Sequence, residues 1–64
     1  MTFQETITKL QNGYTCMLPN YKGYFKYDYF INQPFFQNED YITYDLDNVK
    51  NRTDFYYIIW QNKN

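Results

Sequence analysis

A tight turn at residues 19–23 is the feature that most constrains how this chain can fold. Pro19 fixes φ at the second position of a turn, and Asn20 tolerates the backbone that the third position requires. Gly23 closes the turn, and a strand with alternating side chains follows it. The turn therefore predicts a β-hairpin around which the rest of the chain is organised.

The segment before this hairpin predicts an amphipathic helix over residues 3–12. Thr2 and Glu5 have the spacing of a capping box, in which each side chain binds the backbone N–H of the other residue. Gly13 is suited to end the helix in a left-handed conformation. The apolar stripe comprises Phe3, Ile7 and Leu10. A helix with one such stripe needs a sheet to pack on.

Three strands are expected, over residues 14–18, 24–31 and 41–45. Residues 32–34 are predicted to interrupt the sheet, and residues 38–40 to form a solvated loop. Residues 54–57 are expected to form one helical turn, with an extended end through Trp60. The face of strand 24–31 that is expected beneath the helix comprises Phe25, Tyr27, Tyr29 and Ile31. The predicted fold is a single α+β domain, residues 1–64, with an N-terminal helix on a small antiparallel sheet.

A chain of 64 residues has a small core, because folding removes only about 60% of the surface of the unfolded chain from water at this length. Domains of this size usually gain support from disulfides, a metal or a second subunit. Cys16 is the only cysteine and the chain has no histidine, which argues against an internal disulfide and a zinc site. Aromatic residues make up 25% of the sequence. We therefore expect a homo-oligomer, in which some rings lie at an interface or in a pocket.

The charge pattern argues against several classes of partner. A formal net charge of −1 lacks both the basic excess of a nucleic-acid-binding protein and the carboxylate excess of a DNA mimic. No apolar run is long enough to span a bilayer, and the N-terminus does not resemble a secretion signal. We expect no polymeric nucleic acid or membrane as a partner, and a location in the cytoplasm.

Catalysis is not expected. Without serine or histidine, the ready nucleophile is Cys16, which has no neighbouring base and lies within an apolar strand. We interpret it as a buried structural residue. Asp45 and Asp47 begin a calcium-loop pattern, but Lys50 and Tyr56 stand where its glycine and glutamate belong, so a solvated turn is expected. The prediction is a non-enzymatic protein without cofactor or metal.

Aromatic and basic residues alternate after the turn, in the order Tyr21, Lys22, Tyr24 and Lys26. Rings and ammonium groups in this order can stack on bases and pair with phosphates. The simpler interpretation is an exposed edge strand, on which lysine protects against pairing with another sheet. A small nucleotide-like ligand needs only one or two rings and a few polar groups.

The order of residues also resembles a known family. The patterns are Phe3-x-Glu5-x-Ile7-x-x-Leu10-x-Asn12-Gly13, then Tyr21-x-Gly23, and finally Asp54 followed by Trp60. They resemble the short phage proteins of the second Thoeris anti-defence family over nearly the full chain. Leu18 stands where that family has an arginine, and Ile59 where it has an aspartate.

The resemblance implies a homo-oligomeric α+β protein that sequesters a nucleotide-derived immune signal in the host cytoplasm. The signal would be of the cyclic ADP-ribose type or a cyclic dinucleotide, bound without cleavage. Tyr21 would stack on a base, and Lys22 or Arg52 would supply a positive group for a phosphate. The candidate ligand-binding residues are Asn20, Tyr21, Lys22, Tyr24, Arg52, Asp54 and Trp60.

Two other functions remain open at this point. The protein could inhibit a host defence protein directly, since exposed tyrosine and tryptophan are typical interface anchors, and the resembled family includes an anti-CRISPR group. A small assembly factor is the third possibility, in which the aromatic residues only hold subunits together.

Overall fold

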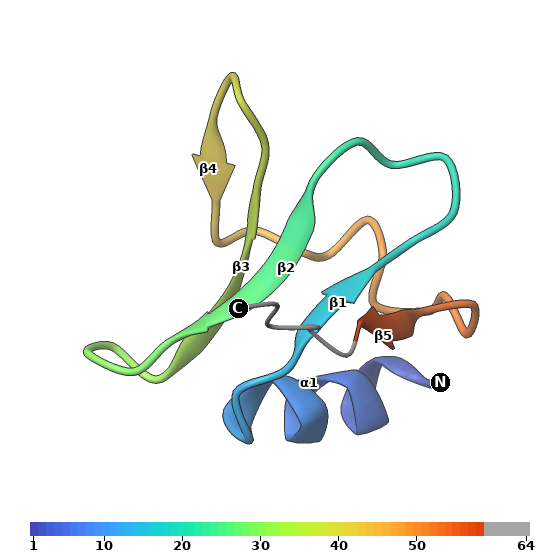
Figure 1. Cartoon of the computed structure of the whole chain (residues 1–64), viewed down its shortest axis with the longest axis horizontal. Helices are drawn as coiled ribbons and strands as arrows, with labels where there is room; N and C mark the ends of the chain where they lie inside the picture. The colour runs from blue at the N-terminus through green and yellow to red at the C-terminus, as the bar shows by residue number, and fades with distance from the viewer. Residues whose placement is uncertain (59–64) are drawn as a thin grey trace, which may run out of the picture.

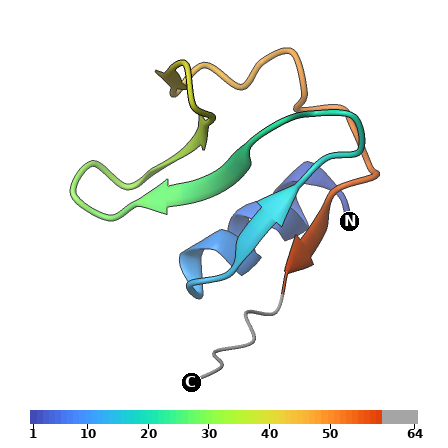
Figure 2. The same ribbon diagram turned by 45° about the horizontal axis from the view of Figure 1, so that its top comes forward.

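The computed structural model describes residues 1–58 and has an α+β fold, as the sequence predicts. One helix, α1 (Phe3–Gln11), precedes the five strands of one antiparallel sheet, whose order is β4-β3-β2-β1-β5 (Figure 1). The strands are β1 (Thr15–Met17), β2 (Tyr24–Asp28), β3 (Gln33–Gln37), β4 (Ile42–Thr43) and β5 (Tyr56–Ile58). Helix α1 packs beside β1, β2 and β5, whereas β3 and β4 lie away from it (Figure 2).

Both ends of α1 have the predicted caps. The Thr2 hydroxyl accepts from the Glu5 backbone N–H at 3.1 Å, and the Glu5 carboxylate accepts from the Thr2 N–H at 2.9 Å. At the other end, Gly13 has φ +92°. The backbone N–H groups of Gly13 and Tyr14 donate to the carbonyl oxygens of Leu10 and Lys9 respectively, which completes a Schellman motif.

The hairpin of β1 and β2 also forms as predicted. Asn20 has φ +68°, and the N–H of Tyr21 donates to the carbonyl oxygen of Leu18 at 3.3 Å. This backbone is a turn with proline second and a left-handed residue third. Cys16 pairs with Phe25 across the two strands.

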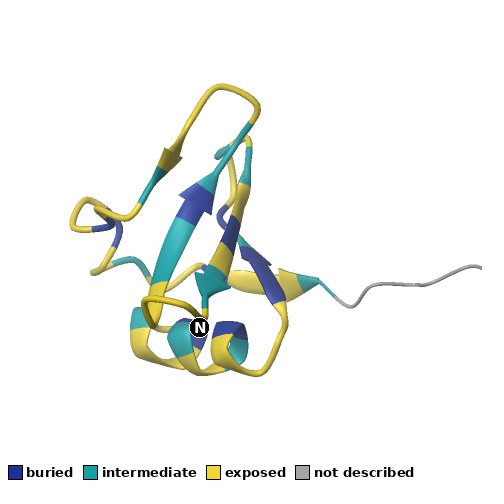
Figure 3. Ribbon diagram, turned by 90° about the vertical axis from the view of Figure 1, so that its left-hand side faces the viewer, coloured by how far each residue is buried: buried dark blue, intermediate teal, exposed yellow. Residues whose placement is uncertain are grey.

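The core lies between the sheet and α1, and extends under residues 44–55. In the register of the sheet, Cys16 pairs with Phe25 and Phe25 with Phe36, so the three side chains share one face. All three are buried (Figure 3). The full set of buried apolar residues is Leu10, Cys16, Leu18, Phe25, Phe36, Leu46, Val49 and Phe55.

The prediction for residues 24–34 is wrong after Asp28. The strand ends there, and residues 29–32 turn the chain back into β3, so the sheet continues through Pro34 instead of breaking. Asn32 adopts φ +56°, and Asp28 Oδ1 accepts from the Phe30 N–H at 2.9 Å. Strand β4 pairs only with Phe36 and Gln37. Pro34 is therefore at a free edge on that side, where proline is tolerated.

The turn at residues 29–32 also changes the predicted face beneath the helix. Phe25 is buried and Tyr27 is half-buried against the core, whereas Tyr29 and Ile31 are exposed. The hydroxyl of Tyr29 still reaches α1, where the carbonyl oxygens of Leu10 and Gln11 lie 3.1 and 3.2 Å away.

Two predictions for the second half of the chain also need correction. The strand expected over residues 41–45 is only two residues long, β4. The helical turn expected over residues 54–57 is absent, because residues 56–58 pair with the free edge of β1 as strand β5. The β-propensity of this aromatic and β-branched segment prevails there over the helix-start signal at Thr53 and Asp54. The predicted extension through Trp60 lies outside the described residues.

Candidate functional site

An open groove lies on the face of the sheet opposite α1. Cys16, Phe25 and Phe36 point into the core, so their strand neighbours point the other way. These neighbours form part of a groove of about 640 Å³, which we call the Tyr24 groove. Its lining residues are Met17, Tyr21, Lys22, Gly23, Tyr24, Lys26, Gln37, Asn38 and Glu39.

The Tyr24 groove combines aromatic rings with positive charge. Tyr24 is 42% exposed, and the Lys26 Nζ lies 5.9 Å from the centre of its ring. Within residues 1–58, no ion pair joins Lys22 or Lys26 to a carboxylate. Glu39 is the acidic residue of the lining. An open groove with rings and two unpaired ammonium groups suits a flat, anionic ligand.

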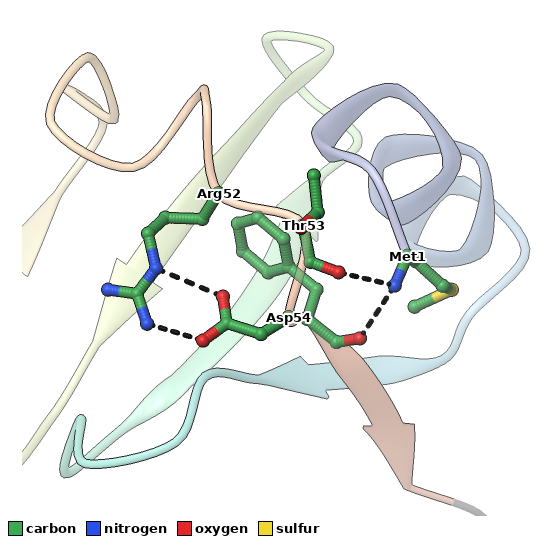
Figure 4. Close-up of polar contacts among 5 residues, drawn as sticks. Met1, Arg52, Thr53 and Asp54 are labelled. Carbon is green, nitrogen blue, oxygen red and sulfur yellow. Dashed lines mark hydrogen bonds and ion pairs between the residues drawn. The ribbon is translucent and has the colours of Figure 1, made fainter.

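Tyr21 links this groove to an ion pair on the neighbouring segment. The guanidinium carbon of Arg52 lies 5.8 Å from the centre of the Tyr21 ring. Arg52 donates from Nε to Asp54 Oδ1 at 3.0 Å and from Nη2 to Oδ2, so the pair is bidentate (Figure 4). The hydrogen bond from Arg52 lowers the pKa of Asp54, and the same bond raises the pKa of Arg52.

The Arg52–Asp54 pair is set in a segment that is fixed to the N-terminus. The Met1 nitrogen donates to the carbonyl oxygens of Thr53 and Phe55, each at 3.0 Å (Figure 4). Because Asp54 already neutralises Arg52, a phosphate would have to compete with this carboxylate for the guanidinium. Lys22 and Lys26 are therefore better placed than Arg52 to receive an anion.

The structure brings together most, but not all, of the predicted site residues. Tyr21, Lys22 and Tyr24 line one groove, and Tyr21 also faces the Arg52–Asp54 pair. Asn20 does not line the groove and serves the backbone turn. Trp60 lies outside the described residues.

Sequence reasoning missed the contribution of β3 to this groove. Gln37, Asn38 and Glu39 reach it because Gln37 pairs with Tyr24. Strand β3 was not predicted, so no sequence signal pointed to these residues. Lys26 could have been included, because it is two residues from Tyr24 on the same face of β2.

A second groove, of about 810 Å³, lies between α1 and the edge of the sheet, where Lys9 is held between two rings. The Lys9 Nζ is 4.9 Å from the centre of the Tyr14 ring and 4.5 Å from that of Tyr57. The two rings meet edge to face at 5.0 Å. The ammonium group of Lys9 already has two aromatic partners, and its contact with Tyr57 joins α1 to β5. This arrangement favours a structural role for Lys9.

The described residues include one cysteine, which is buried, and no cluster of three or more metal-ligating side chains. Cys16 is fully buried, and burial raises the pKa of its thiol to about 11. Among residues 1–58, no three His, Cys, Asp or Glu side chains are grouped as metal ligands. Asp45 and Asp47 are exposed and share a local turn, in which the Asp47 N–H donates to Asp45 Oδ1 at 3.2 Å. Over the same residues, the protein has no helix long and apolar enough to cross a membrane.

Comparisons of the chain with protein-family models, curated proteins and solved structures found no match. The resemblance to the phage anti-defence family stays a prediction.

Proposed function

We propose that the protein is a non-enzymatic phage anti-defence protein that binds and sequesters a nucleotide-derived immune signal in the Tyr24 groove. The observation that carries this proposal is the meeting of Tyr21, Lys22, Tyr24 and Lys26 in one open groove. The ligand would be of the cyclic ADP-ribose type or a cyclic dinucleotide. Such a molecule has bases for the rings and phosphates for the ammonium groups.

Each part of the groove has a separate role in this proposal. The exposed ring of Tyr24 stacks on a base, a contact worth about 1–3 kcal/mol. Lys22 and Lys26 pair with the phosphates, and the Gln37 side chain supplies a hydrogen bond. Arg52 stabilises Tyr21 through the contact of its guanidinium with the Tyr21 ring.

We also propose that the protein acts as a homo-oligomer in the host cytoplasm. Within residues 1–58, no helix packs on the sheet face that carries the groove in the way that α1 covers the opposite face. Exposed apolar side chains continue along it, including Tyr24 and Ile42 on β2 and β4, and Tyr56 on β5. A sheet with apolar residues on both faces is stabilised when a second layer covers the open one.

Isothermal titration calorimetry tests the ligand proposal. The folded protein is titrated with cyclic ADP-ribose isomers and cyclic dinucleotides, and we expect saturable binding of at least one. Tyr24→Ser should weaken this binding by about 5- to 150-fold, the equivalent of the stacking free energy. Tyr41→Ser is the matched control, because Tyr41 is 54% exposed and lies outside the groove.

Chromatography of the released ligand distinguishes sequestration from catalysis. After the complex is denatured, the ligand should be recovered unchanged. No heat of binding from any member of the panel, with a protein that is folded by circular dichroism, would contradict the proposed function.

The second candidate function is direct inhibition of a host defence protein. The observation that favours it is the number of large apolar side chains on the surface, foremost Phe30, which is 99% exposed. Rings of this kind act as anchors in protein interfaces. A stable complex with a purified defence protein, formed without any small ligand, would support this candidate over the first.

A further inference from the structure

A small pocket between the sheet and residues 45–49 is lined by three aromatic rings, those of Tyr21, Phe36 and Tyr41. Residues 45–49 belong to the segment that leads from β4 to β5 (Figure 1). The volume of the pocket is about 250 Å³. Sites for drug-sized ligands usually have about 300–1,000 Å³, so this pocket suits a small head group. Its inner wall consists of buried apolar side chains, which are Phe25, Leu46 and Val49.

The three rings are inclined to one another. The ring centres of Tyr21 and Phe36 are 6.0 Å apart, with an interplanar angle of 86°. Those of Phe36 and Tyr41 are 6.1 Å apart, with an angle of 53°. The face of an aromatic ring is electrostatically negative, and several rings set at angles around one space recognise quaternary ammonium groups. The geometry of this pocket is that of an aromatic cage, which we call the Phe36 cage.

The Phe36 cage also includes one carboxylate, that of Asp45. Within residues 1–58, no ion pair joins Asp45 to a lysine or arginine. The cations nearest in sequence, Lys50 and Arg52, do not line the cage, and each is paired with another carboxylate. Arg52 contacts the Tyr21 ring at 5.8 Å, but Asp54 already balances its charge. The Phe36 cage therefore has a negative charge and no cation of its own.

We propose that the Phe36 cage binds a methylated ammonium group, with the three rings around the cation and the Asp45 carboxylate as its counter-ion. An unmethylated ammonium is strongly hydrated, and its N–H groups would lose their water against the apolar inner wall. A quaternary ammonium has no N–H group, and its methyl groups can contact that wall. Free choline-type amines and methylated lysine side chains share this chemistry.

The inference goes beyond the proposed function and does not depend on it. The Phe36 cage and the Tyr24 groove have only Tyr21 in common among their lining residues. Their charges are opposite, since Lys22 and Lys26 line the groove and Asp45 lines the cage. Substitutions that avoid Tyr21 can therefore test each site without the other.

NMR titration of the full chain with choline tests the proposal, with sodium chloride at the same ionic strength as the blank. We expect saturable shifts of the ring signals of Phe36 and Tyr41. The neutral isostere of choline, in which carbon replaces the nitrogen, should bind at least about tenfold more weakly, because it keeps the shape and loses the charge. Tetramethylammonium should likewise bind more tightly than ammonium.

A peptide that contains trimethyllysine distinguishes the two sources of the ligand. If the peptide binds more tightly than choline, and its unmodified form does not bind, the cage reads a methylated protein. If choline binds and the peptide does not, the ligand is a free amine. Either result supports a cage for methylated ammonium.

Tyr41→Ser should weaken choline binding about 2- to 30-fold, the equivalent of one cation–π contact. Tyr41→Phe keeps the ring and should bind choline as the parent does. Tyr41 is 54% exposed, so both variants should fold. Tyr24→Ser is the matched control, because Tyr24 lies outside the cage. It should leave choline binding unchanged, whereas Tyr41→Ser should leave nucleotide binding unchanged.

Asp45→Asn tests the counter-ion. The Asp45 Oδ1 accepts from the Asp47 N–H at 3.2 Å, and an asparagine oxygen can accept the same bond, so the local turn should persist. Choline should bind this variant more weakly, whereas Asp40→Asn, which removes an exposed carboxylate outside the cage, should bind as the parent does.

The absence of saturable shifts with choline and tetramethylammonium in the folded protein would overturn the proposal. Equal affinities for choline and its neutral isostere would overturn it too, as would unchanged affinity in both Tyr41→Ser and Asp45→Asn. None of these results bears on the proposed function, because Tyr24→Ser tests nucleotide binding separately.

Discussion

Gly23 lies so close to Phe36 that a β-carbon at Gly23 would be 2.5 Å from Cζ of the Phe36 ring. The same β-carbon would be 2.6 Å from the carbonyl oxygen of Gln37. The start of β2 therefore packs its bare backbone against β3. We expect Gly23→Ala to lower the free energy of unfolding by about 1–3 kcal/mol, the usual cost of inserting atoms into a packed interior. Urea unfolding followed by circular dichroism measures the loss.

Gly13→Ala is the comparison that isolates this packing effect. Gly13 has φ +92°, and nothing lies within 4 Å of the position its β-carbon would take. The cost there comes from backbone strain alone, about 1–2 kcal/mol. In a protein that already carries Phe36→Leu, Gly23→Ala should lower the free energy of unfolding by less than it does in the parent. Gly13→Ala should lower it by the same amount in both proteins. A Gly23→Ala protein as stable as the parent would disprove the close approach.

Asn20 offers a separate test of backbone against ligand. With φ +68°, Asn20→Ala should destabilise the protein by about 1 kcal/mol, whereas Asn20→Gly should cost little, because glycine adopts this conformation freely. Since Asn20 does not line the Tyr24 groove, calorimetry should show the same ligand affinity for both variants and the parent. Loss of ligand binding in a folded Asn20→Gly protein would instead assign Asn20 a direct contact.

The features that sequence reasoning placed correctly depend on interactions between near neighbours. The cap of Thr2 and Glu5 spans three residues, and Gly13 and Asn20 each meet a local backbone requirement. Such motifs are readable because the partners are adjacent in the chain. Tyr21, Lys22 and Tyr24, which are also near neighbours in the chain, line one groove, and their binding of a ligand stays a prediction.

The elements that were missed depend on pairing across the fold. Strand β5 exists because β1 offers a free edge more than thirty residues earlier in the chain. The four-residue turn before β3 depends on two hydrogen bonds that the Asp28 carboxylate accepts, from the Phe30 N–H and from the Tyr44 hydroxyl, and Tyr44 is sixteen residues away. The predicted strand ran past Asp28 because the residues after it have high β-propensity. The sheet was predicted to break at Pro34 because proline is rare inside a sheet, but Pro34 lies at an edge position, where proline is tolerated. Gln37 reaches the groove through the pairing of β3 with β2, which the sequence did not predict.

The hydrogen bond between Tyr44 and Asp28 predicts a specific effect of pH. The Tyr44 hydroxyl lowers the pKa of Asp28 below its ordinary value of 3.8. The contribution of this hydrogen bond to stability is therefore present above pH 3.8 and is lost as the pH falls through the lowered pKa of Asp28. Tyr44→Phe should return the Asp28 pKa toward its ordinary value, as measured by NMR titration of the carboxyl carbon. An unchanged pKa in Tyr44→Phe would show that the bond does not form in solution.

The same bond acts in the opposite direction at alkaline pH. Asp28 raises the pKa of Tyr44 above its ordinary value of 10.0, because the neutral hydroxyl is the form that donates. The contribution of the hydrogen bond to stability is present below pH 10 and is lost as the pH rises through the raised pKa of Tyr44. Asp28→Asn should bring the ultraviolet titration of Tyr44 back toward that of an exposed tyrosine, which difference spectra against Tyr44→Phe will resolve.

Cys16 gives the last prediction, because its thiol is fully buried and its pKa is raised to about 11 from an ordinary value of 9.0. The neutral thiol is the form that the fold favours, mainly because burial penalises the thiolate. Its contribution to stability is complete below pH 9 and is lost between about pH 9 and about pH 11. The loss should approach about 1.4 kcal/mol per pH unit in that window. Tyrosines titrate there too, so the measured quantity is the difference in unfolding free energy between the parent and Cys16→Ala.

The reactivity of the Cys16 thiol tests the same burial independently. Iodoacetamide requires the thiolate and access to it, so native protein at pH 8 should be labelled only as fast as it opens. Urea below the unfolding midpoint should accelerate labelling in proportion to the opened population, and full denaturation should bring it to the rate of a free cysteine. Two results together would place the thiol at the surface. The native protein would be labelled rapidly, and the difference in unfolding free energy between the parent and Cys16→Ala would not change with pH up to about pH 11. In that case Cys16 would again be a candidate nucleophile, and the assignment of a non-enzymatic function would lose its main chemical support.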